Sequence, residues 1–167
     1  QDLKGKNLCL VDPNSTSGNN VPRFAMDKMG IDPDAFFGKL LYSGSHENAV
    51  TALLQGTCDA AFNWWNTEKE SNLLRMAARG AVKADSVRII MKSDLIPGSP
   101  TTLKRSLPEA MKADIKRAFL EAPVKGREAW LRISDGNATG YHEVKHEDYQ
   151  VIIDLNRFVD RLRRKPS

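Results

Sequence analysis

The feature that most constrains the fold is a regular alternation of short apolar runs with amphipathic segments over residues 1–98. The apolar run Asn7–Val11 leads into a turn-rich stretch, and then into a segment with apolar side chains at helical spacing that ends at Gly30. The same order returns after the runs Leu40–Tyr42 and Cys58–Phe62. Short strands that alternate with helices are typical of a mainly parallel sheet flanked by helices. The sequence therefore predicts an α/β lobe.

Further elements complete this predicted lobe. A helix is expected near His46–Gln55, with Gly56 as its C-cap, because the apolar side chains of this segment share one helical face. A second helix is expected over Glu68–Arg79. The apolar run Val87–Met91 is expected to form a fourth strand.

The character of the sequence changes over residues 99–167. Ser106–Pro108 is expected to open a helix that Pro123 closes, and a last amphipathic helix is expected near Glu147–Arg164. These helices have apolar faces, yet the segment has no convincing strand to cover them. We therefore expect that the element they pack on is missing from the chain, and the start at Gln1 without an initiator methionine agrees with this.

The charge pattern does not favour a nucleic-acid partner. The chain has a formal net charge of +4, and its basic excess gathers near the end, at Arg161–Lys165. Cations suit the carboxyl end of a helix because they interact favourably with the helix dipole. We therefore interpret the basic cluster as a solvated helix end, and we expect no nucleic-acid partner.

Hydropathy indicates a chain that is not inserted in a membrane. No apolar run approaches the roughly 20 residues that a helix needs to cross a bilayer. The chain also lacks a basic segment followed by an apolar leader, so we expect that its signal peptide has been removed.

Cysteine and histidine indicate no metal site and no cofactor. Cys9 and Cys58 lie in apolar runs, where cysteine commonly behaves as a small buried side chain, so we expect two unpaired thiols, although a disulfide stays possible. None of the three histidines lies in a cluster with cysteine or carboxylate at ligand spacing.

The loop after the first predicted strand is the first candidate binding site. In an open parallel sheet, ligands lie outside the carboxyl ends of the strands. The loop Asp12–Gly18 contains Asn14, Ser15, Thr16 and Ser17 and runs directly into a helix. Hydroxyl donors and unpaired N–H groups at a helix start form a cradle for an oxyanion. The alternative is an ordinary Ser/Thr helix cap after an Asp-Pro turn.

The loops after the second and third strands add further candidates. Ser45 and His46 stand at the next helix start, where His46 could donate to an anion or simply lie on the surface. The third loop contains Asn66 and Glu68 after two adjacent tryptophans, whose usual role is packing. Glu68 by itself also suits the first turn of a helix. The three loops share one predicted sheet edge, which favours a binding site there.

With these loops in view, the sequence resembles the phosphate/phosphite/phosphonate-binding family of ABC-transporter substrate-binding proteins. Weaker similarity extends through Leu107-Pro108 to Tyr149, so the resemblance covers nearly the whole chain. The matching motifs are Asp2–Lys6, Asp12–Gly18 with Val21-Pro22, Ser45–Glu47, Asn66–Glu68 and Ser93–Pro97.

The resemblance implies a periplasmic binding protein fold of type II, with two lobes and a cleft that closes on the ligand. Residues 1–98 would be the ligand-binding second lobe. Residues 99–167 would be the return segment and C-terminal helices of the first lobe, whose N-terminal part is absent. In such proteins the loop that matches Ser15–Ser17 grips the phosphonate oxygens, together with the histidine that matches His46.

The resemblance also bears on the ligand's organic substituent. The carboxylate that matches Glu68 faces the amino group in binders of aminoethylphosphonate. Some of these binders have a second carboxylate where this chain has Gly98-Ser99, so this chain has lost one ammonium-facing group.

The sequence therefore predicts a periplasmic solute-binding protein that is not an enzyme and needs no cofactor. We expect it to capture a phosphonate, phosphite or phosphate for a membrane ABC permease, and we expect the isolated chain to bind weakly. One alternative is a ligand-sensing partner of a sensor kinase. Another is a hydrolase with Ser15 or Ser17 as nucleophile, His46 as base and Glu68 as orienting group, although no Gly-x-Ser-x-Gly turn is present.

Overall fold

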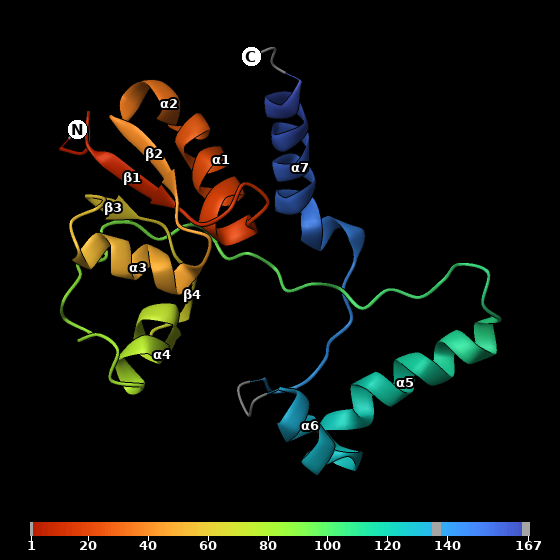
Figure 1. Ribbon diagram of the computed structural model, residues 1–167. Helices are drawn as coiled ribbons and strands as arrows, with labels where there is room; N and C mark the ends of the chain where they lie inside the picture. Colours follow the sequence, from red (N-terminus) through yellow and green to blue (C-terminus); the bar gives the residue numbers. More distant parts are fainter. Residues whose placement is uncertain (1, 135–137, 165–167) are drawn as a thin grey trace. The chain divides into compact units, whose positions relative to one another are not determined.

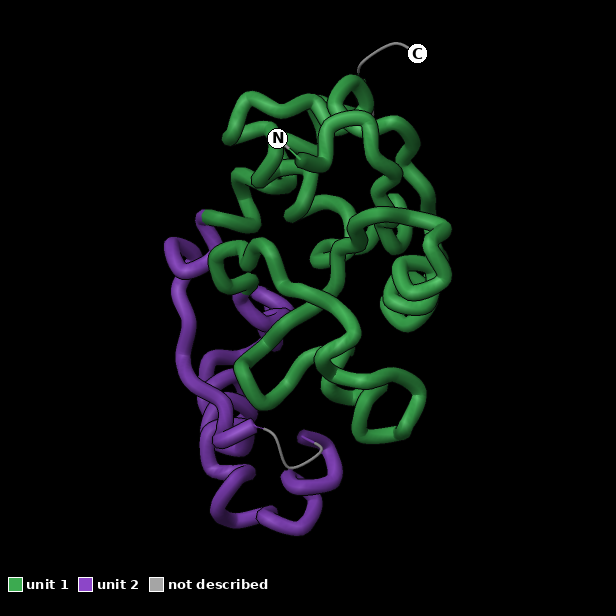
Figure 2. Tube along the Cα trace, turned by 90° about the vertical axis from the view of Figure 1, so that its left-hand side faces the viewer, with its two compact units in different colours: residues 1–96, 151–167 green, residues 97–150 purple. Residues whose placement is uncertain are grey.

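The computed structural model describes residues 2–134 and 138–164 (Figure 1). The chain divides into two compact units, which Figure 2 distinguishes by colour. The first unit comprises Gln1–Ile96 and Val151–Ser167, and the second comprises Pro97–Gln150. Each unit has its own packing.

The first unit contains the strands and the helices that flank them. Its elements are β1 (Asn7–Leu10), a π-helical turn η1 (Thr16–Asn20), α1 (Val21–Lys28), α2 (Pro33–Phe36), β2 (Lys39–Tyr42), α3 (His46–Leu54), β3 (Ala60–Ala61), β4 (Trp65–Thr67), β5 (Glu70–Ser71), α4 (Asn72–Ala78) and α7 (Gln150–Arg163).

A parallel three-stranded sheet organises this unit, in the order β2-β1-β3. Figure 1 shows α1 and α2 on one side of this sheet and α3 on the other. Leu8 and Leu10 of the central strand are buried with Met26 of α1, while the intervening Cys9 points to the opposite face. The predicted α/β lobe with a mainly parallel sheet is therefore confirmed.

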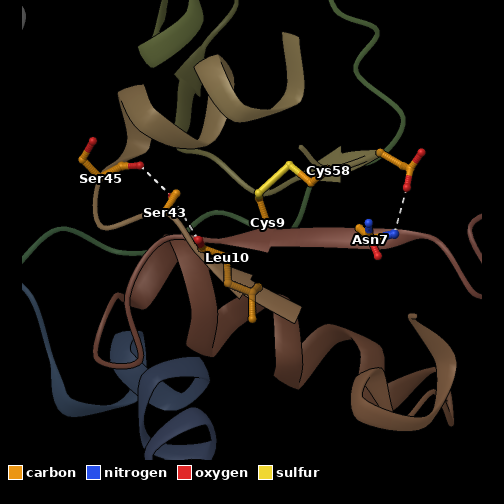
Figure 3. Close-up of a disulfide and its surroundings, with 7 residues drawn as sticks. Asn7, Cys9, Leu10, Ser43, Ser45 and Cys58 are labelled. Carbon is orange, nitrogen blue, oxygen red and sulfur yellow. Dashed lines mark hydrogen bonds between the residues drawn. A yellow bond between two sulfur atoms is a disulfide. The ribbon is translucent and has the colours of Figure 1, made fainter. Parts of the chain in front are cut away.

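The buried cysteines are joined, so the expectation of two unpaired thiols is wrong. Cys9 and Cys58 form a disulfide whose Cα atoms lie 5.9 Å apart (Figure 3). The segment before β3 runs beside the start of β1, where Asp59 N–H donates to the carbonyl of Asn7 and Asn7 N–H donates to the Asp59 carboxylate. This pairing brings together two residues that are 49 positions apart in sequence, which the local sequence does not show.

Two of the predicted elements differ in the structure. The described residues Val87–Met91 form no strand, and the side chain of Ile90 is 60% exposed, because a strand needs a neighbouring strand to pair with as well as apolar side chains. The helix expected over Glu68–Arg79 begins only at Asn72, because the preceding residues form the antiparallel β4-β5 hairpin.

The cap of α4 explains where that helix begins. The Ser71 hydroxyl accepts a hydrogen bond from Leu74 N–H at 3.2 Å, which satisfies one of the unpaired donors of the first turn. The preceding helix, α3, has Gln55 as its C-cap, and Gly56, which the sequence predicts as the cap, follows directly with a φ of +73°.

The second unit is helical. Its elements are α5 (Glu109–Lys125), α6 (Arg127–Ile133) and the short 3₁₀ helix η2 (His146–Tyr149). Pro123 does not close α5, as the sequence suggested, because the loss of one N–H donor within the last turn still allows the helix to continue to Lys125. Trp130 is buried, makes an edge-to-face contact with Tyr141 with ring centroids 5.1 Å apart, and donates through Nε1 to the carbonyl of Ala138.

The last helix, α7, packs within the first unit. Phe158 of α7 lies against Phe24 of α1, with ring centroids 5.4 Å apart. The sequence instead grouped α7 with residues 99–149, because local periodicity does not show what a helix packs against. Assignment of residues 99–167 to the other lobe of a complete binding protein stays a prediction.

The disulfide leads to a first testable expectation. Reduction should lower the free energy of unfolding by about 2–4 kcal/mol, because the cross-link restricts the unfolded chain. Urea unfolding with and without a reductant measures this change, with the thiol state verified by mass spectrometry. A Cys9→Ala/Cys58→Ala double variant is the control and should not respond to the reductant. An unchanged midpoint after complete reduction would contradict the expectation.

Candidate functional site

The loop between β1 and η1 is held by a series of local hydrogen bonds. Asn14 N–H donates to the Asp12 side chain at 2.8 Å, and Ser15 N–H donates to the Asp12 carbonyl at 2.9 Å. The Ser15 hydroxyl then caps η1 by accepting from Gly18 N–H at 3.1 Å. The loop therefore combines the cap that ordinary Ser/Thr chemistry predicts with an exposed stretch of polar residues that could contact a ligand.

A close approach of backbone and side chain fixes the end of this loop. A Cβ on Gly18 would lie 2.4 Å from Cβ and Cγ2 of Val11, which is closer than real side chains allow. Val11 N–H also donates to the carbonyl of Gly18 at 3.0 Å. Glycine is therefore required here for lack of space, and the loop closes directly onto the end of β1.

The loop after β2 is tied to the same strand end. Ser43 N–H and the Ser43 hydroxyl both donate to the carbonyl of Leu10, at 2.9 and 3.0 Å (Figure 3). Gly44, with a φ of +80°, donates its N–H to the carbonyl of Val11 at 2.8 Å. Ser45 caps α3 by accepting from Asn48 N–H at 3.0 Å. The starts of η1 and α3 are thereby held to the carboxyl end of β1.

This arrangement brings Ser17 and His46 together. The Ser17 hydroxyl oxygen lies 3.3 Å from Nε2 of His46, across the two loops. Asn63, which follows β3, donates through its side-chain amide to the carbonyl of His46 at 2.9 Å. Residues that follow all three parallel strands therefore meet around His46, as the shared sheet edge predicts.

The imidazole of His46 is partly withdrawn from water. In the described part of the chain, its Nδ1 is buried and has no hydrogen-bond partner. Burial lowers the pKa of His46 below its usual value, against the opposing influences of Asn63 and Glu47. The ring is therefore predominantly neutral at neutral pH and has one N–H to donate.

Asn66 and Glu68 lie in the β4-β5 hairpin and have other partners. Asn66 donates through its side-chain amide to the Glu70 carboxylate at 3.3 Å. Glu68 is ion-paired with Lys92 and its side chain is 78% exposed. Nζ of Lys92 also lies 4.4 Å from the ring centroid of Trp65. Whether Asn66 and Glu68 contact a ligand stays a prediction.

Several residues that shape this region were not singled out from the sequence. Ser43 and Asn63 stand immediately after predicted strands, so their position at the sheet edge was the available signal. Asn19 is 4% exposed and bonds to the loop, but one asparagine within a helical start has no distinctive sequence pattern.

The chemistry of the cluster favours binding of a tetrahedral oxyanion. Hydroxyl groups, a neutral imidazole and N–H groups at helix starts all donate to negatively charged oxygen. A Ser-His hydrolase would need a group that orients Nδ1 of His46, and Glu68 instead pairs with Lys92. Among the described residues, no group of histidine, cysteine and carboxylate side chains is arranged to hold a metal ion. Nor does any helix in the described ranges have the length and apolar character of a membrane span.

Comparisons with known proteins agree with this chemistry. The model of a family described as the periplasmic substrate-binding protein of a phosphonate ABC transporter matches residues 1–149. The phosphate-import protein PhnD of Mycolicibacterium smegmatis is 28% identical over 163 residues, which cover 89% of this chain and 50% of that protein. The phosphonates-binding periplasmic protein of Escherichia coli is 34% identical over 110 residues, which cover 65% of this chain and 30% of that protein.

A solved structure is similar over almost the whole chain. The binding protein component of an ABC phosphonate transporter from Pseudomonas aeruginosa is 27% identical, and it matches with a TM-score of 0.67 over 96% of this chain and 51% of that one. The chain therefore spans about half the length of the M. smegmatis and P. aeruginosa proteins, and a smaller share of the E. coli protein.

The contact at Gly18 leads to a second expectation. Gly18→Ala should lower the free energy of unfolding by about 1–3 kcal/mol, because the added methyl group forces Val11 and the loop apart. Gly98→Ala is the matched control, since a Cβ there would have no atom within 4 Å. Urea unfolding of both variants measures the difference, and equal effects would show that space at Gly18 is not limiting.

The environment of His46 leads to a pH dependence. Because its pKa is lowered on folding, the unfolded chain binds more protons just below the usual histidine value of 6.5. The contribution of neutral His46 to the free energy of unfolding is fully present above pH 6.5, and it is lost as the pH falls through the pKa of His46 in the folded state. His46→Asn should therefore flatten the decline in stability between about pH 7.5 and pH 5.

Unfolding by urea across this pH range provides the measurement. His142→Asn, at an exposed histidine of the second unit, is the matched substitution and should retain the slope of the original chain. The same slope in His46→Asn and in the original chain would contradict the expectation.

Proposed function

This chain belongs to the family of periplasmic substrate-binding proteins of phosphonate ABC transporters, and on that premise we propose that it serves to capture a phosphorus oxyanion for import. The proposed ligands are phosphonates and the related anions phosphite and phosphate. The names of the relatives support this range, since one is a phosphate-import protein and another a phosphonates-binding protein.

The single observation that carries the proposal is the contact between Ser17 and His46 at neighbouring helix starts. An anion placed there would receive hydrogen bonds from the loop residues and from the imidazole. The proposed ligand-binding residues at the two helix starts are Asn14, Ser15, Thr16, Ser17, Ser45 and His46. Each charge-assisted hydrogen bond contributes about 1.5–3 kcal/mol.

Asn66 and Glu68 complete the proposed set at the β4-β5 hairpin. There Glu68 would face an amino group on the ligand's organic substituent. Such an amine would have to compete with Lys92, which already neutralises the carboxylate. Glu68 and Lys92 are both on an exposed surface, where an ion pair contributes only about 0–1 kcal/mol, so the exchange would cost little.

The proposed setting is the periplasm, with a membrane ABC permease as partner. The Cys9–Cys58 disulfide supports an oxidising compartment, because reducing systems keep thiols free in the cytosol. In the complete protein we propose a type II fold of two lobes, in which closure around the ligand excludes water by a hinge motion.

A periplasmic sensor would use the same binding site, and only the protein partner would differ. A pull-down with the cognate permease or kinase would distinguish import from sensing. The hydrolase alternative is not favoured, because the relatives are substrate-binding transport proteins and Glu68 is paired with Lys92 rather than with His46.

Titration of the chain followed by nuclear magnetic resonance tests the proposal. Phosphate, phosphite and methylphosphonate at millimolar concentration should shift the amide signals of residues 14–18 and His46, and sulfate serves as the tetrahedral anion without phosphorus. Ser17→Ala should weaken binding about tenfold or more, because one charge-assisted hydrogen bond is lost.

The matched control is Ser86→Ala, which removes an exposed hydroxyl elsewhere in the first unit. This variant should bind like the original chain. Failure of every phosphorus oxyanion to shift these signals, or equal affinity of the two variants, would overturn the proposal.

A further inference from the structure

The side chain of Asn19 joins the anion-binding loop to two elements behind it. It is 4% exposed, although asparagine is a polar residue that is usually exposed. Its Nδ2 donates to the carbonyl of Pro13 and to Oδ1 of Asn20, both at 2.9 Å. Its Oδ1 accepts from Nε of Arg23 at 3.2 Å and from the Tyr42 hydroxyl at 3.3 Å. The amide is therefore bonded on both sides.

We propose that Asn19 is a positioning residue that holds the loop of residues 13–18 in the conformation that binds the anion. The inference rests on the proposed function, in which Asn14–Ser17 contact the ligand. Asn19 itself is directed inward, and it acts through the carbonyl of Pro13 at the start of the ligand-binding stretch.

The neighbours of Asn19 determine which way its amide faces. Nε of Arg23 can only donate, so the oxygen of Asn19 must point toward Arg23 and the nitrogen toward Pro13. Arg23 is itself held by a 2.9 Å ion pair with Asp34. Burial disfavours the charge of Arg23, but its contacts with Asp34 and Tyr42 outweigh this effect and raise its pKa. The donor toward Asn19 therefore stays in place.

The loop depends on this inward bond for its order. Within the loop, the bonds from Ser15 N–H to Asp12 and from Gly18 N–H to Ser15 connect residues close in sequence, while the bond from Val11 N–H to the Gly18 carbonyl closes the two ends of the loop. The Asn19 amide instead spans six residues to Pro13, and it connects the loop to α1 through Arg23 and to β2 through Tyr42. Without it, the carbonyl of Pro13 would lose its partner within the chain, and the hydroxyl donors would have to be ordered by the anion itself.

Amide hydrogen exchange without any anion tests the positioning role. In the free chain, the N–H groups of Gly18, Asn19 and Asn20 all donate to Ser15. In Asn19→Ala their protection should fall about tenfold, since the loop loses the hydrogen bond that connects it to Asn19. The amides of α3 should keep their protection, which separates loosening of the loop from general unfolding.

Two further variants make the test specific. Asn19→Asp keeps an oxygen that accepts from Arg23 and Tyr42 but loses the donor to Pro13, so it should also lose loop protection. If Asn19→Ala does not fold, loop protection in Asn19→Asp provides the test. Tyr42→Phe removes one bond to Oδ1 and leaves the bond to Pro13, so it should retain both loop protection and affinity for methylphosphonate.

Affinity for methylphosphonate is the second measurement, and Asn19→Ala should weaken it about tenfold, or about 1.4 kcal/mol. Unchanged loop protection in a folded Asn19 variant, or lost protection with unchanged affinity, would overturn the inference. If the original chain binds no phosphorus oxyanion but the Asn19 variants still lose loop protection, the proposed function fails and the ordering of the loop by Asn19 is upheld.

Discussion

Parallel pairing of β1 with β2 and β3 is the constraint on which the rest of the first unit depends. Because the three strands run in the same direction, the loops that follow them meet at one edge of the sheet. The contact between Ser17 and His46 and the bond from Asn63 to the His46 carbonyl are direct consequences. The same pairing places Cys9 beside Cys58, so the disulfide reinforces the strands from which the candidate site extends.

The candidate site contains neutral donors. The charged groups that support it, Arg23 and Asp34, act through Asn19. Hydroxyl groups, helix N–H groups and a neutral imidazole can bind an oxyanion without a lysine or arginine in direct contact. A cation attracts an anion from any direction. A hydroxyl group contributes to binding only when its hydrogen bond to the anion is well aligned, so affinity at a neutral site depends on geometry. Order in the Asp12–Gly18 loop is therefore central to how such a site would distinguish one tetrahedral anion from another.

Three kinds of contact order the Asp12–Gly18 loop. Local turns and the Ser15 cap fix its backbone, the close approach of Gly18 to Val11 fixes its end, and the buried amide of Asn19 connects it to α1 and β2. Asn19 and Arg23 form a polar network inside the unit in which the described bonds satisfy both polar atoms of the Asn19 amide. A satisfied buried network specifies one arrangement, because any alternative leaves a buried polar group without a partner.

The sequence by itself determined the α/β character of residues 1–98, the helix start near Ser45 and His46 and the position of the candidate loops at one sheet edge. These features follow from periodicity and capping, which depend on residues a few positions apart. Only the tertiary structure decided that Cys9 pairs with Cys58, that Val87–Met91 forms no strand, that Glu68 pairs with Lys92 and that α7 packs on α1. Each of these depends on which distant segments become neighbours, and local sequence patterns carry no such information.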